Sequence, residues 1–194
     1  MMKRRLSAAL WPLFAPMLAP MLAIVLFALP FAGAAAQDTV SISAFYGQWS
    51  GSGVSESNVS LYFRLTSRDL DVTIAPEGDG FVVNWTTVQR QRGDPENPTP
   101  ERKSSVLRFV ATDRPNVWRA AGSSDPLLDE RYAWARLQGQ TLTVHTLAIA
   151  KDGGYEMQIY NRTLSALGMN LDFVAFQNGE ERRTAKGRLV KVGN

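Results

Sequence analysis

The chain has 194 residues, of which 45% are apolar and 20% charged, and it contains no cysteine. Without cysteine it can form no disulfide, use no cysteine nucleophile and carry no lipid on a cysteine. The net charge is +3, from 21 basic and 18 acidic residues, and no block of like charge runs along the chain. This balance argues against a protein that binds nucleic acid or an anionic membrane through bulk electrostatics.

The N-terminal segment has the pattern of an export signal. Three basic residues at positions 3–5 precede an uncharged run from Leu6 to Ala36, which ends in three alanines. A basic start, an apolar stretch and a small-residue exit are typical of a cleaved secretory signal peptide. The apolar run is also long enough for a membrane anchor, which is the rival interpretation. Four prolines within it, together with the alanine exit, favour cleavage.

Cleavage after Ala36 would leave residues 37–194, with 18 basic and 18 acidic residues, because the signal holds three basic residues and no acidic one. A chain of that size can bury a sufficient core as one domain without disulfides. The sequence therefore predicts a signal peptide over 1–36 and a single domain over 37–194. We expect a periplasmic or secreted bacterial protein with no stable membrane insertion after cleavage and no nucleic-acid partner.

Beyond the signal, apolar and polar residues alternate in short runs separated by turn residues. Period-two alternation is typical of strands with one buried face. The expected strands follow the first segment around Trp49 and are Leu61–Leu65, Leu70–Ile74, Phe81–Trp85, Ser104–Ala111, Val117–Ala121, Tyr132–Leu137, Thr141–Ala150, Tyr155–Arg162, Leu171–Phe176 and Arg183–Val192. Gly78–Gly80 and Asn178-Gly179 are strong turn signals between them.

Because most connections are too short for a parallel crossover, the sheet should be antiparallel. The pattern predicts an all-β fold, either an up-and-down barrel of about eight to ten strands or a sandwich. One longer linker, from Arg90 to Lys103, holds three prolines and seven charged residues. It should form an exposed loop.

The segment "FYGQWSGSGVSES", Phe45–Ser57, raises a question, because a run of serine and glycine packs poorly in a strand. In a closed barrel the first strand must bend and pair with the last. Gly51 and Gly53 would permit that bend and a close approach of the opposing strand. Trp49 would then plug one barrel end, either as an ordinary core residue or beneath an arginine.

The same segment resembles the first signature of lipocalins, in which an aromatic residue precedes Gly-x-Trp, here Gly47 and Trp49. The terminal "RRTAKGRLVK" is similar to the closing segment of that family, whose arginine packs over the tryptophan. The resemblance, in the wider calycin sense, implies a lipocalin-like barrel. It also implies that Arg182, Arg183 or, as first choice, Arg188 covers Trp49.

Residues suited to catalysis are scarce. The chain has one histidine, His145, and no Gly-x-Ser-x-Gly nucleophile motif. A single histidine does not make a typical zinc site, which needs three or four protein ligands. His145 as a general base is conceivable, although an outward or hydrogen-bonded strand histidine explains it with fewer assumptions. We assign no catalytic residue, no metal site and no cofactor, and expect binding rather than turnover.

Large apolar residues recur at alternating strand positions and are the candidates to line a ligand cavity. They are Phe63, Phe81, Trp85, Trp134, Met157 and Phe173. A barrel of this size can hold one small molecule, or the same residues can fill a solid core. Gln158, Tyr160 and Arg162 occupy the face opposite Met157. If that face points inward, the cavity is polar.

The sequence thus favours an exported lipocalin-like barrel that binds a small hydrophobic or amphipathic ligand, such as a lipid. A protein-binding module, for example a periplasmic inhibitor barrel that presents its loops, is the alternative. A barrel-type isomerase or cyclase is the third hypothesis. The volume and lining of the interior should distinguish the three hypotheses. A deep apolar cavity would favour ligand binding, and a filled core with a protruding loop or terminus would favour the protein-binding module. A cavity-facing His145 beside a carboxylate would favour the enzyme.

Export is directly testable. We expect N-terminal sequencing of the protein from the periplasmic or extracellular fraction to begin at Gln37, since the alanine run ends at Ala36. A protein that keeps Met1 and stays in the membrane fraction would contradict the signal-peptide interpretation and support a retained anchor.

Overall fold

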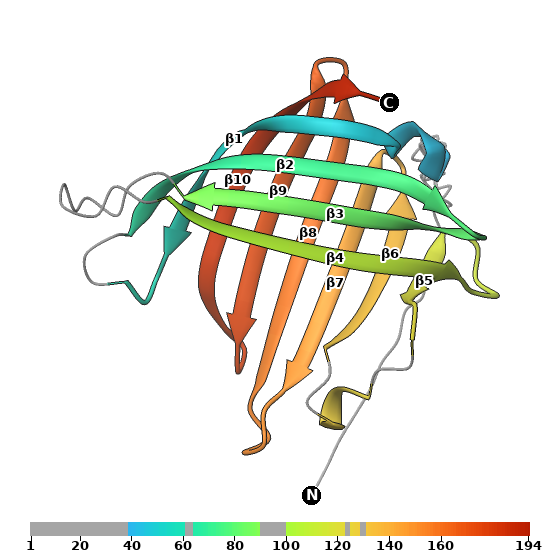
Figure 1. Cartoon of the computed structure of the whole chain (residues 1–194). Coiled ribbons are helices and arrows are strands. Elements are labelled where there is room, and N and C mark those ends of the chain that lie inside the picture. Colours follow the sequence, from blue (N-terminus) through green and yellow to red (C-terminus); the bar gives the residue numbers. More distant parts are fainter. Residues whose placement is uncertain (1–38, 61–63, 90–99, 123–124, 129–130) are drawn as a thin grey trace, which may run out of the picture. The chain divides into compact units, whose positions relative to one another are not determined.

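The computed structural model describes residues 39–60, 64–89, 100–122, 125–128 and 131–194, and these form an all-β structure (Figure 1). Two short 3-10 helices accompany the strands, η1 (Ile42–Phe45) and η2 (Pro126–Leu128). The strands are β1 (Gly47–Ser57), β2 (Leu65–Glu77), β3 (Gly80–Gln89), β4 (Glu101–Ala111), β5 (Val117–Ala120), β6 (Tyr132–Gln138), β7 (Thr141–Ile149), β8 (Tyr155–Ser165), β9 (Gly168–Gln177) and β10 (Glu180–Gly193).

The ten strands close into one antiparallel barrel. Each strand pairs with the next along the chain, and β1 pairs with β10, so the sheet has no free edge. Figure 1 shows β1–β4 running across the view in front of β7–β10, which run up and down. The prediction of an up-and-down barrel is confirmed, and the sandwich is excluded.

Turn residues behave as their chemistry predicts. Asn178 and Gly179 both have positive φ, 52° and 85°, which a tight turn between β9 and β10 requires. The expected long linker is shorter than predicted, because Glu101–Lys103 already belong to β4. Residues 90–99 of that linker lie outside the described residues.

Closure of the barrel depends on glycine in β1. A Cβ atom added at Gly51 would lie 1.9 Å from the carbonyl oxygen of Arg188 in β10, and one at Gly53 would lie 2.4 Å from that of Lys186. These distances are far below van der Waals contact, so only glycine allows the two strands to approach here. Gly47 has φ +131°, and a Cβ there would meet the carbonyl of Gly193 at 2.6 Å. The small residues after Trp49 therefore serve the β1–β10 seam.

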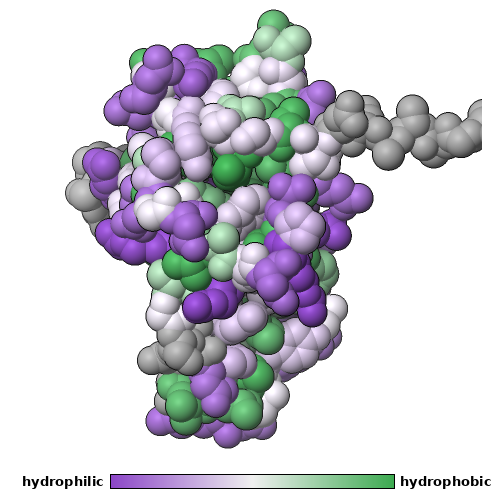
Figure 2. Space-filling view, turned by 90° about the vertical axis from the view of Figure 1, so that its right-hand side faces the viewer, coloured by the Kyte–Doolittle hydropathy of each residue, from purple (hydrophilic) through white to green (hydrophobic). Residues whose placement is uncertain are grey.

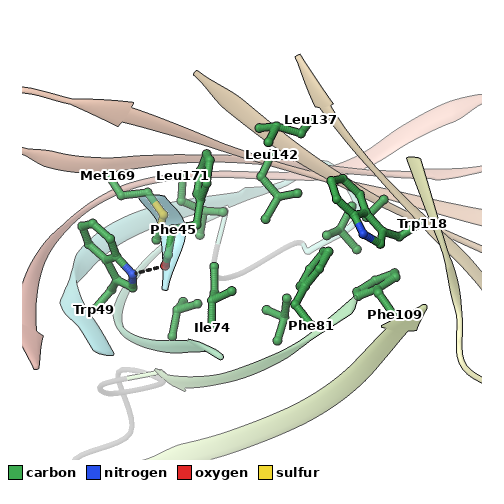
Figure 3. Close-up of a cluster of buried hydrophobic side chains, with 14 of the residues drawn as sticks. Phe45, Trp49, Ile74, Phe81, Phe109, Trp118, Leu137, Leu142, Met169 and Leu171 are labelled. Carbon is green, nitrogen blue, oxygen red and sulfur yellow. Dashed lines mark hydrogen bonds between the residues drawn. The ribbon is translucent and has the colours of Figure 1, made fainter. Parts of the chain in front are cut away.

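One end of the barrel is closed by apolar side chains (Figure 3). Trp49 is 5% exposed, and its indole Nε1 donates a hydrogen bond to the carbonyl of Phe45 in η1 at 2.9 Å. Trp49 thus plugs the barrel end as predicted. The cation over it is Lys191, with Nζ 5.9 Å from the ring centroid, rather than Arg188. Arg188 pairs with Ser52 and points to the outer face, because the next residue along β10, Leu189, is buried on the inner face.

The outer surface mixes residue types. Figure 2 shows hydrophobic residues scattered among hydrophilic ones on the face in view. Among the described residues, none of the helices has the length and apolar character needed to cross a membrane.

Gly51→Ala should destabilise the barrel by about 1–3 kcal/mol, the usual range for forcing extra atoms into a packed site. The added methyl would collide with backbone atoms of β10, which cannot move aside as the end of a flexible side chain could. Urea denaturation measures the difference, with Ser52→Ala as the matched control because Ser52 is exposed on the outer face. Equal stability of the two variants would show that the seam can relax.

Candidate functional site

The inner face of the barrel changes character along its length. At the end closed by Trp49 the inward side chains form one buried apolar cluster. Toward the other end they surround a cavity of about 270 Å³. Its lining comprises Ser55, Arg68, Leu70, Val72, Trp85, Thr86, Thr87, Lys103, Ser105, Arg131, Gln158, Tyr160, Arg162, Leu171, Phe173, Arg183 and Ala185. Five of these residues are basic and none is acidic, so the cavity is cationic.

Two of the predicted lining residues face this cavity. Trp85 on β3 and Phe173 on β9 both line it. Phe81 also points inward but lies in the closed apolar half, with its ring 5.0 Å from that of Phe109. Phe63 lies outside the described residues.

The other two predicted lining residues, Trp134 and Met157, occupy the outer face. On β6 the neighbours of Trp134, Ala133 and Ala135, are fully buried, so the indole between them points away from the interior. It stacks on the ring of His145, with centroids 4.6 Å apart and planes 3° apart. Met157 faces out because Gln158, next to it on β8, lines the cavity.

The polar face of β8 points inward. Gln158, Tyr160 and Arg162 all line the cavity, which makes the interior polar on this side. Arg162 is the deepest of the three, since its neighbours across the sheet are the buried Leu142 and Leu171. It therefore lies at the boundary between the cavity and the apolar core.

Arg162 is the most unusual residue of the cavity. It is 1% exposed, and its Nε and Nη1 atoms have no hydrogen-bond partner within the described part of the chain. The guanidinium lies over two aromatic rings, 5.7 Å from the centroid of Trp85 and 5.5 Å from that of Tyr160. These cation–π contacts stabilise the charge in part, but no carboxylate of the described residues pairs with Arg162.

Burying a charge without an anion destabilises the charged form. Burial lowers the pKa of Arg162 to about 10, and the nearby Tyr160 phenol opposes this shift. The guanidinium nevertheless remains protonated at neutral pH. Buried polar nitrogens normally have hydrogen-bond partners, so these two mark a place in the cavity wall where a bound group could be held.

The remaining polar groups on this side satisfy one another. The Tyr160 hydroxyl donates to Gln158 Oε1 at 2.7 Å, and Arg131 Nη1 donates to the same oxygen at 3.3 Å. Gln158 also donates to Glu156, whose carboxylate lies 3.7 Å from Arg131 Nη2. Arg131 therefore has a counter-charge, whereas Arg162 has none among the residues that the structure describes.

Nothing in the described residues forms a metal centre or a histidine-based active site. No group of three or more His, Cys, Asp or Glu side chains comes together within the described ranges. His145 is on the outer face against Trp134, so the general-base role considered for it does not reach the cavity.

The sequence predicts that Arg162 lies on a strand face that could point inward, but it does not mark this residue as part of a site. A signal existed in the alternation of Gln158, Tyr160 and Arg162. The missing information was the direction of the face, because β8 carries apolar residues on the other side as well.

No family model and no curated protein matches the sequence. Among solved structures, the S-type phycobiliprotein lyase CPES from Guillardia theta is similar, with a TM-score of 0.52 and 12% identity over 80% of this chain and 94% of that chain. This likeness supports a lipocalin-like barrel and concerns the fold alone. An N-terminal dehydratase from the difficidin assembly line matches with a TM-score of 0.23 and 8% identity, over 76% of this chain and 78% of that chain, which carries no argument.

The pH dependence of stability should report on His145. Burial first, and the charge of Arg136 second, lowers the pKa of His145 below its ordinary 6.5. The unfolded chain then binds a proton more readily than the folded chain, so His145 reduces stability as pH falls through about 6.5 toward the folded-state pKa. His145→Phe keeps an aromatic ring on Trp134 without a titrating group.

Urea denaturation at about pH 7 and about pH 5 should therefore show a larger loss of unfolding free energy for the natural protein than for His145→Phe. Other titrating groups affect both proteins alike. Equal losses would contradict a depressed pKa at His145.

Proposed function

We propose that this protein binds a small amphipathic acid inside its barrel, with Arg162 pairing with the acidic group. The single observation that carries the proposal is a fully buried guanidinium with two unpartnered nitrogens in the cavity wall. Charge-assisted hydrogen bonds to a carboxylate are among the strongest that a protein can offer. The bound anion would replace the hydration that Arg162 lost on folding.

The rest of the cavity suits the apolar part of such a ligand. Trp85, Tyr160 and Phe173 form a connected aromatic wall, with centroids 5.3 Å and 4.7 Å apart in successive pairs. Aliphatic side chains from β2 and β9 line it as well. Ligand sites of this kind are mostly apolar, with few polar groups that orient the guest. The similarity to a lipocalin-like barrel is consistent with ligand binding in the interior.

From the sequence, the ligand could be hydrophobic or amphipathic. The buried Arg162 favours an amphipathic acid. An entirely apolar guest, such as a neutral lipid, would leave Arg162 unpaired and is disfavoured. The cavity is also the feature expected of a binding barrel rather than of a protein-binding module with a filled core. We propose export to the periplasm or medium on the N-terminal sequence pattern alone.

Two fluorescent probes test the role of charge. Anilinonaphthalene sulfonate carries an anionic group that N-phenyl-naphthylamine lacks, and the two are otherwise alike. Arg162→Met should weaken binding of the anionic probe by about tenfold or more, the effect of losing a hydrogen bond to a charged group. Binding of the neutral probe should stay the same or improve.

The matched control is Arg136→Met, which removes the same charge from an exposed outer position. It should leave both affinities unchanged. The ligand-free Arg162→Met protein should also be more stable, because an uncompensated buried charge is removed. Its free energy of unfolding, measured by urea denaturation, should rise by on the order of 1 kcal/mol or more. Unchanged affinity of Arg162→Met for the anionic probe would refute the proposed function.

A further inference from the structure

A second group of basic residues surrounds the mouth of the cavity. Arg68, Lys103 and Arg183 line both the deep cavity and a hollow of about 310 Å³ that adjoins it. Ser55 belongs to both linings as well, so the two spaces share a wall. The hollow includes one acidic residue, Glu101, whose carboxylate lies 3.0 Å from Lys103 Nζ.

Arg68 and Arg183 lie near each other in this hollow, and among the described residues that line it Glu101 is the one acid beside them. The pKa of Arg68 is lowered by burial first and by the charge of Arg183 second, with Glu101 opposing both. Arg68 Nη2 donates to Gln89 Oε1 at 3.2 Å, but its buried Nε finds no partner in the described ranges. Like charges in such proximity are unfavourable unless an anion lies between them.

The two cationic positions are separated along the barrel. Across the β9 ladder, Arg162 lies opposite Leu171 and Arg183 lies opposite Ala175. Four residues of strand correspond to about 13 Å. The wall between these positions includes Trp85, Tyr160 and Phe173, which offer no charge.

We propose that the ligand is a dianion, an elongated molecule with an acidic group at each end and an apolar middle. One acidic group pairs with Arg162 at the base of the cavity. The other lies at the mouth between Arg68 and Arg183, and the middle packs on the aromatic wall. This inference rests on the proposed function for the inner group and adds a separate site for the outer one.

The test measures how well acids of equal chain length, with one or two carboxylates, displace anilinonaphthalene sulfonate from the cavity. The competitors are straight-chain monocarboxylates from octanoate to tetradecanoate and the α,ω-dicarboxylates of equal length. In a cavity with one cationic end, a second carboxylate would weaken binding, because it must leave water for an apolar surface. With two cationic ends, the dicarboxylate of best length should bind several-fold more tightly than its monocarboxylate.

Variants of Arg68 and Arg183 test whether the tighter binding of the dicarboxylate depends on the mouth of the cavity. Arg183→Gln and Arg68→Gln should each lower the dicarboxylate affinity more than the monocarboxylate affinity, and so remove most of the preference for the dicarboxylate. Arg188→Gln, which removes an exposed outer charge from the same strand as Arg183, should preserve the preference. The preference should also shrink at high salt, because the mouth is partly exposed.

The outcomes distinguish the two proposals. If monocarboxylates bind as tightly as dicarboxylates at every length and still depend on Arg162, the dianion inference is overturned and the proposed function stands. If the dicarboxylate preference survives both mouth variants, the inference is likewise overturned. If neither series displaces the probe and Arg162→Met has no effect, the proposed function itself fails.

Discussion

Closure of the barrel between β1 and β10 is the constraint on which the other features depend. An antiparallel sheet that closes on itself has no exposed edge and separates its residues into an inner and an outer face. The seam requires backbones closer than any side chain permits, and Gly51 and Gly53 meet that requirement. Trp49, two residues before Gly51 in the same seam, is thereby held over the barrel end, where its indole donates a hydrogen bond to the Phe45 carbonyl of η1.

The closed interior is divided between stability and binding. The half capped by Trp49 is packed with apolar side chains, among them Phe81, whose ring contacts both Phe109 and Trp118. The other half holds the cavity and the buried Arg162. A charge buried without a counter-ion lowers the stability of the ligand-free protein, and the packed half offsets this loss. Such a division is typical of binding proteins, in which sites are less stable than the scaffold that supports them.

The cationic cavity also explains why the overall charge of the chain is uninformative. Residues 37–194 contain equal numbers of basic and acidic residues, yet the cavity lining is wholly basic among its charged members. Acidic side chains near it are occupied, Glu156 with Arg131 and Glu101 with Lys103. The net charge sums over all residues, whereas folding gathers several basic residues in the cavity. A ligand in the cavity therefore encounters the local positive potential rather than the net charge.

The sequence by itself determined the all-β class, the turns and the plugging role of Trp49, because these depend on local alternation and on residues such as Asn178 and Gly179. It did not determine which face of a strand is inside. In β8, apolar Met157 faces out and Arg162 faces in, against the usual preference for apolar residues inside. The register of pairing along the whole sheet decides which face of the strand points inward. The identity of the cation over Trp49, Lys191 instead of Arg188, likewise followed from the β1–β10 register. Tertiary structure alone brought Arg68, Arg162 and Arg183 to one cavity, since these residues lie on three strands distant in sequence.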